Sequence, residues 1–96
     1  MAGSEAALGL ALGHVRNVTA SLMAREDDTG EASFLAAQCV EIEGLLADLG
    51  AIPEFVEEGL DAASSLTRAS MALASADGAV PLVARVAVRS LLARVS

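Results

Sequence analysis

Two side chains in this sequence belong to types that often do chemistry, His14 and Cys39, and each is the only one of its kind. An exposed imidazole could accept a proton or a phosphoryl group near neutral pH. His14 flanks the apolar stripe expected for its helix, so it is the one candidate catalytic residue, although a lone helical histidine is more often a boundary residue without chemistry. A single cysteine excludes an internal disulfide, and Cys39 among aliphatic neighbours is interpreted as a small buried hydrophobe in a reducing compartment.

The acidic side chains are numerous, but their spacing does not build a site. The turn over residues 26–31 lacks the alternating oxygen ligands of an EF-hand, so it is interpreted as a solvated turn with a helix cap. Carboxylate pairs such as Glu54 with Glu57, or Glu57 with Asp61, would do acid–base chemistry only inside a cleft that separates their pKa values. Phosphate-binding loops, dinucleotide fingerprints, cysteine pairs and Glu-x-x-His pairs are absent from the sequence. We therefore predict no metal, no cofactor and, apart from His14, no catalytic residue, which favours a non-enzymatic protein.

Composition predicts one folded domain. The chain has 96 residues, 54% of them hydrophobic and 20% charged, which suits a single domain over residues 1–96. Its net charge of −7 argues against nucleic acid and anionic membranes as partners. No apolar stretch approaches the ~20 residues of a membrane span, and the N-terminus lacks the features of a signal peptide. We expect an acidic, cytoplasmic protein, and its exclusive use of arginine as a base fits a GC-rich bacterial genome.

Three Gly-containing breaks divide the chain into four helical patterns, at residues 27–30, 50–53 and 77–81. Such short connections favour antiparallel neighbours. Alternation typical of a strand is arguable only over residues 83–88. The predicted fold class is therefore all-α, an antiparallel four-helix bundle with up-down-up-down topology that dimerisation could complete.

Residues with special backbone roles predict the helix ends. Ser4 is expected to cap the first helix. The second is expected to start at Asp28 or Thr29, because Asp28 followed three residues later by Glu31 is typical of a capping box. Gly50 should end the second helix in the left-handed conformation, and Pro53 suits the first turn of the third.

Apolar side chains repeat along the helices with the spacing of packing stripes. Small aliphatic residues dominate, and a domain of this size is not expected to hide so much apolar surface inside one monomer. The predicted partner is a second copy, forming a homodimer, or another helical protein. The candidate interface residues are Leu8, Val15, Val18, Leu22, Val83, Val86, Leu91 and Val95.

Charge is distributed unevenly along the chain. Acids concentrate between Glu26 and Asp61, whereas the bases lie before and after this stretch. Within one bundle, Arg94 would lie near Glu54 and Arg89 near Asp61, as exposed pairs worth about 0–1 kcal/mol each. Alternatively, the acidic middle of one subunit faces the basic end of another, an arrangement that salt should weaken. The sequence leaves both arrangements open.

The segment His14-Val15-Arg16-Asn17-Val18-Thr19 resembles the phospho-acceptor box of histidine kinase dimerisation helices and of related phosphotransfer proteins. The resemblance implies a helical hairpin that dimerises into a four-helix bundle, with His14 as phosphoryl acceptor and Asn17 as a supporting polar residue. It is confined to this short segment, in which no acid follows His14 and no proline follows Asn17.

Three functions therefore compete. The leading hypothesis is a non-enzymatic module for helical protein–protein interaction or oligomerisation. The first alternative is a histidine phosphotransfer protein that uses His14. The second is a small secreted helical-hairpin protein of the kind exported by actinobacterial specialised systems, whose Trp-x-Gly turn this sequence lacks.

Overall fold

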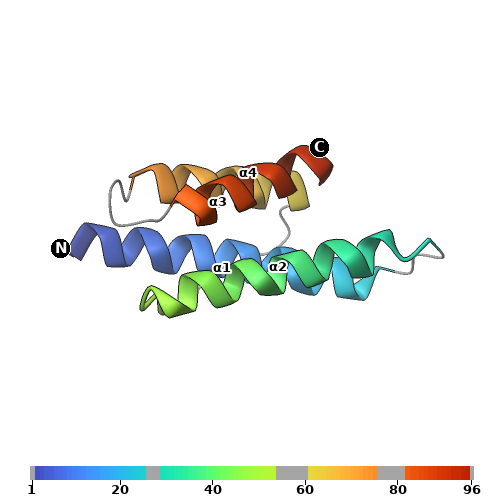
Figure 1. Ribbon diagram of the computed structural model, residues 1–96, viewed down its shortest axis with the longest axis horizontal. Coiled ribbons are helices and arrows are strands. Elements are labelled where there is room, and N and C mark those ends of the chain that lie inside the picture. The colour runs from blue at the N-terminus through green and yellow to red at the C-terminus, as the bar shows by residue number, and fades with distance from the viewer. Residues whose placement is uncertain (1, 26–28, 54–60, 76–81, 96) are drawn as a thin grey trace.

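The computed structural model describes residues 2–25, 29–53, 61–75 and 82–95. Within these ranges the regular secondary structure consists of α-helices. They are α1 (Ala2–Ala24), α2 (Glu31–Asp48), α3 (Ala62–Ser75) and α4 (Leu82–Val95) (Figure 1). The loosely alternating residues 83–88 belong to α4, and no strand occurs within these ranges. The all-α prediction is confirmed.

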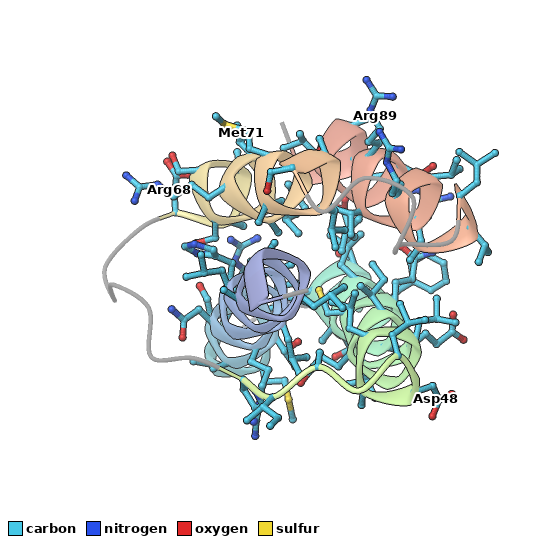
Figure 2. The ribbon with its side chains drawn as sticks, turned by 90° about the vertical axis from the view of Figure 1, so that its left-hand side faces the viewer. Asp48, Arg68, Met71 and Arg89 are labelled. Carbon is cyan, nitrogen blue, oxygen red and sulfur yellow. The ribbon has the colours of Figure 1, made fainter. Side chains whose placement is uncertain are left out.

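The four helices form two hairpins stacked face to face, α1 with α2 and α3 with α4 (Figure 2). α1 packs against α2 and α3, while α4 packs against α3 and α2, so α1 and α4 lie on one diagonal. The C-terminal ends of α1 and α4 meet the N-terminal ends of α2 and α3 around a hollow lined by Leu22, Arg25, Glu31, Leu35, Ala62, Arg94 and Val95. Each contacting pair is thus antiparallel, and the predicted antiparallel four-helix bundle is confirmed.

The helix directions follow the order up-down-down-up along the chain (Figure 1). α2 and α3 point the same way because both begin at the end of the bundle where α1 finishes. The strict alternation expected from short connections does not extend to this pair. The physical reason is the late start of α3, at Ala62 rather than near Pro53, so the connection after α2 is longer than the tight turn that the sequence predicted.

The core consists almost entirely of aliphatic side chains. The predicted stripe on α1 is buried as expected, with each member at most 6% exposed: Leu8, Ala11, Val15, Val18 and Leu22. The other helices add fully buried leucines, which are Leu46, Leu66, Leu73 and Leu91. Ala11 of α1 and Ala69 of α3 are also completely buried, and such small side chains allow helices to approach closely.

The end of α2 follows the predicted mechanism. Gly50 has a φ of 89°, a left-handed conformation that an L side chain rarely adopts. The Gly50 amide donates to the carbonyl of Ala47 at 2.9 Å, and the Ala51 amide donates to that of Leu46 at 3.1 Å. These two bonds form a Schellman motif, so the prediction that Gly50 terminates the helix is confirmed.

The helix starts differ from expectation. Ser4 lies inside α1, which begins at Ala2, so it is not the cap. The N-cap of α2 is Gly30, with a φ of 76°. The hydroxyl of Thr29 accepts a hydrogen bond from the Glu31 amide at 3.2 Å. Asp28 lies outside the described residues. Side-chain oxygens can satisfy such amides from more than one sequence position, which limits the prediction of caps.

α3 has a cap that the sequence analysis missed. The Oδ1 atom of Asp61 accepts the backbone amide of Ser64 at 2.7 Å. This bond, with a weaker effect from the Ser64 side chain, holds the pKa of Asp61 below its usual value. The signal was available, because an Asp directly before an Ala-rich run is a strong N-cap. Asp61 thus caps the start of α3, and Glu57, its predicted partner in a carboxylate pair, lies outside the described residues.

Candidate functional site

His14 is buried in the bundle. Its side chain is 7% exposed, and its Nδ1 atom is buried without a hydrogen-bond partner. Burial lowers the pKa of His14, and the positive charge of Arg68 on α3 lowers it further. The ring is therefore kept neutral and shielded from solvent. A phosphoryl donor needs access to an imidazole nitrogen, and the low exposure of His14 does not favour such access.

The lowered pKa of His14 predicts a pH dependence of stability. Below about pH 6.5 the unfolded chain binds a proton on His14 before the folded chain does, so folding is disfavoured as pH falls through that region. We expect the free energy of unfolding to decrease by up to about 1.4 kcal/mol per pH unit from this residue. His14→Gln should flatten that decrease. Guanidinium unfolding followed by circular dichroism between pH 5 and 8 measures it, and equal slopes in both proteins would contradict the assignment.

Cys39 belongs to a small polar cluster between α1 and α2. The hydroxyl of Thr19 donates to Oε2 of Glu43 at 2.8 Å and lies 3.1 Å from the carbonyl of Val15. Nε of Arg16 lies 3.5 Å from Oε1 of Glu43. Burial raises the pKa of the completely buried Cys39 thiol, the charge of Glu43 raises it further, and a hydrogen bond with Thr19 opposes both. The cluster joins two helices and disfavours a reactive thiolate.

The buried thiol predicts slow chemical modification. In the folded protein Cys39 should react with a disulfide reagent such as dithionitrobenzoate about 100-fold more slowly than in guanidinium, because reaction requires an opening of the α1–α2 contact. The absorbance of the released thionitrobenzoate follows the reaction. Similar rates in the two conditions would show that the thiol reaches solvent in the folded state.

The predicted interface residues separate into two groups. Leu8, Val15, Val18, Leu22 and Leu91 are at most 6% exposed and belong to the core of this chain, and Val95 packs partly against that core. The apolar stripes that these residues form are thus packed against other helices of the same chain. Val83 and Val86 on α4 are 61% and 51% exposed. From the predicted set, these two valines are available to a partner.

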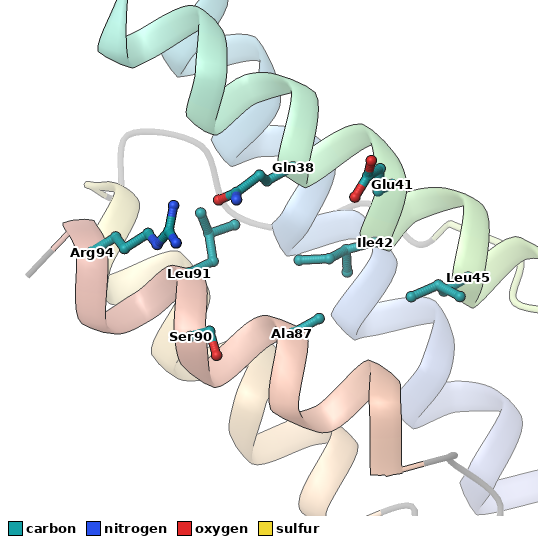
Figure 3. A pocket seen from close by; sticks show the side chains of 8 residues that line it. All are labelled: Gln38, Glu41, Ile42, Leu45, Ala87, Ser90, Leu91 and Arg94. Atoms are coloured by element: carbon teal, nitrogen blue, oxygen red, sulfur yellow. The ribbon is translucent and has the colours of Figure 1, made fainter.

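An open groove runs between α2 and α4, which form the least extensive of the four helix contacts. Figure 3 shows its lining side chains, four from each helix: Gln38, Glu41, Ile42, Leu45, Ala87, Ser90, Leu91 and Arg94. Buried Ile42 and Leu91 form its floor. The groove encloses about 140 Å³, which is smaller than the roughly 300–1,000 Å³ of typical small-molecule sites. Its size therefore does not favour a metabolite as occupant.

Apolar side chains are exposed along the two helices that border this groove. Phe34 on α2 is 56% exposed, and the guanidinium of Arg94 lies 5.6 Å from the centroid of its ring. Val83 and Val86 are exposed on α4, and Leu45 is half-buried on α2. Sequence reasoning missed Phe34. An aromatic residue placed away from the buried stripe of its helix was the signal that could have identified it.

The two helices that border the groove carry charges of opposite sign, and one charged residue of each, Glu41 and Arg94, lines the groove. The acids of α2 are Glu31, Glu41, Glu43 and Asp48, with no base, whereas the bases of α4 are Arg85, Arg89 and Arg94, with no acid. In the described ranges no ion pair crosses from α2 to α4. The expected contact between Arg89 and Asp61 does not form, since Arg89 lies beside Leu73, and Glu54 lies outside the described residues.

A second, shallower groove lies on the outer side of α1 and α2. It is larger, about 460 Å³, and is lined by Leu12, Arg16, Val40, Glu43, Gly44, Ala47, Ala51 and Pro53. Val40 is 53% exposed there, almost the same fraction as Val86 on α4. Pro53, which also lines this groove, is the last described residue before the range 54–60.

Other kinds of site find no support in the described ranges. Three or more potential metal-ligating side chains do not cluster anywhere in residues 2–25, 29–53, 61–75 and 82–95. None of the four helices has both the length and the hydropathy needed to cross a membrane. The acidic turn at 26–28 and the carboxylates Glu54, Glu57 and Glu58 lie outside these ranges. Comparison with protein families, with curated sequences and with solved structures yields no match for this chain.

Proposed function

We propose that this protein is a non-enzymatic module that associates through exposed apolar helix surface, with a second copy of itself or with another helical protein. The observation that carries this proposal is the surface around the α2–α4 groove. Phe34 on α2 and Val83 and Val86 on α4 are each more than half exposed, on the two helices that border this groove. Val83 and Val86 lie one helical turn apart on α4, and neighbouring exposed apolar side chains on a small protein are typical of a contact surface.

The chemical alternatives receive less support from the same structure. Phosphotransfer needs an accessible imidazole, whereas His14 is 7% exposed and faces the charge of Arg68. Thiol chemistry needs a stabilised thiolate, whereas burial raises the pKa of Cys39. A lone free thiol fits a reducing setting, so the proposal includes the cytoplasm as the place of action. No observation specifically favours the third hypothesis, a small secreted helical-hairpin protein.

Association is testable directly on the purified chain. Sedimentation equilibrium between about 10 µM and 1 mM should show a mass above that of the 9.7 kDa monomer, because burying the exposed valines and Phe34 stabilises a complex. Interference optics suit a chain that has neither Trp nor Tyr. A strict monomer throughout this range, together with no helical partner retained on the immobilised protein, would overturn the proposal.

A further inference from the structure

We propose that a hollow between α3 and α4 binds a small oxyanion, a phosphate group that is either free or carried as a monoester. The hollow is lined by Ser70, Leu73 and Ala74 of α3 and by Arg85 and Arg89 of α4. None of these residues is among the exposed apolar side chains on which the proposed association rests. The site therefore adds a ligand to the protein and is tested independently of that association.

The spacing of residues on the two helices creates the hollow. α3 and α4 lie side by side as an antiparallel hairpin, and Ser70 and Ala74 are one helical turn apart on α3 (Figure 2). Both have short side chains, so this strip of α3 leaves space beside the buried Leu73. On α4, Arg85 and Arg89 are also one turn apart, and both line the same space. Two short side chains thus share one hollow with two arginines.

The charge at the hollow is positive and is not compensated within the described part of the chain. α3 carries one arginine and α4 carries three, and neither helix contains an acid. Arg85 and Arg89 form no ion pair in the described ranges, and Asp77, in the segment between the two helices, lies outside them. Like charges one turn apart disfavour a helix. An anion bound to both arginines would relieve this repulsion.

Size and donor chemistry favour an oxyanion as the occupant. The hollow encloses about 90 Å³, which is enough for a few water molecules or one small ion but is below the roughly 300–1,000 Å³ of typical small-molecule sites. A guanidinium presents its N–H donors in a planar fork that matches phosphate oxygens, and the hydroxyl of Ser70 can donate as well. Arg89 is exposed, so the hollow opens to solvent and a monoester can leave its organic group outside.

Phosphate binding is testable by nuclear magnetic resonance on the full ¹⁵N-labelled chain. Inorganic phosphate is added to about 50 mM while NaCl is lowered to hold the ionic strength constant, because screening alone also changes chemical shifts. We expect saturable shifts in the amide signals of residues 70–74 and 85–89. Methyl phosphate should give the same pattern if the site accepts monoesters, and a response to inorganic phosphate alone would assign the free ion as the ligand. Acetate, with one charge and two oxygens, should bind more weakly than either.

Matched variants locate the site. Arg85→Gln and Arg89→Gln should each raise the dissociation constant for phosphate by about tenfold or more, since each removes charge-assisted hydrogen bonds. Arg94→Gln removes the same charge from the same helix but lines other hollows, so it should change this constant by less than about threefold. Ser70→Ala keeps both arginines and should weaken binding by a smaller factor than their loss. Circular dichroism checks that each variant keeps its helical content.

Three results would overturn the inference. Shifts that stay linear up to about 50 mM phosphate and equal those in acetate would show general ion effects without a site. Equal affinity of the parent, Arg85→Gln and Arg89→Gln would place phosphate elsewhere on the protein. A parent that binds no phosphate while Asp77→Asn does would show that a carboxylate of the chain itself occupies the arginines. Sedimentation tests the proposed association separately, so a failure of either proposal leaves the other standing.

Discussion

Truncating Leu46 to alanine is expected to lower the free energy of unfolding by about 2–5 kcal/mol, a large part of the roughly 5–15 kcal/mol that stabilises a small domain. Leu46 lies on α2 and is completely buried, so the change removes apolar contacts and leaves a cavity. Guanidinium unfolding followed by circular dichroism at a fixed protein concentration measures the loss.

Leu82→Ala is the matched control for this truncation. It removes the same atoms from a side chain that is 72% exposed on α4, so it should change stability by less than about 1 kcal/mol. Equal losses in the two variants would show that Leu46 does not occupy the core position described above. A change in the denaturant dependence would instead indicate altered compactness of the unfolded chain.

Enlarging Ala11 to leucine is expected to cost about 1–3 kcal/mol or more, although it adds apolar surface. Ala11 is completely buried on α1, the helix that packs against both α2 and α3, and a bulkier side chain would push these helices apart. Each kcal/mol lost should lower the melting temperature by about 4–8 °C in a domain of this size. Differential scanning calorimetry measures the shift.

Ala20→Leu provides the comparison on the same helix. Ala20 is exposed, so the added side chain meets solvent and the melting temperature should change by no more than a few degrees. The contrast tests whether the abundance of alanine reflects close helix packing or only helix propensity. A neutral or stabilising effect of Ala11→Leu would show that the helices around Ala11 pack less closely than in the structure.

Periodicity was sufficient to predict the helices and their buried faces. The α1 stripe from Leu8 to Leu22 is buried throughout, because apolar spacing of a helical period specifies a packed face whatever its neighbour. Gly50 was predictable for a similar reason, since a left-handed helix end strongly favours glycine. Local physics determines both features.

Features that depend on which helices become neighbours were not predictable. His14 flanks the α1 stripe, and only the position of α3 on that side decides that its ring is buried rather than exposed. The predicted interface had the same weakness, because a stripe such as Val15 and Val18 can pack within one chain or against another. The order up-down-down-up likewise follows from where α3 begins, a cap at Asp61 that the periodicity did not define.

The parallel orientation of α2 and α3 has a consequence for the folding pathway. Each hairpin closes through contacts between residues near in sequence, whereas the packing of α1 on α3 and of α2 on α4 joins distant parts of the chain. Short-range closure is rapid, and the entropy lost in closing a longer loop slows the meeting of the two halves. The two hairpins would thus form rapidly and associate more slowly. Their association then sets the rate at which the leucines of both hairpins become buried.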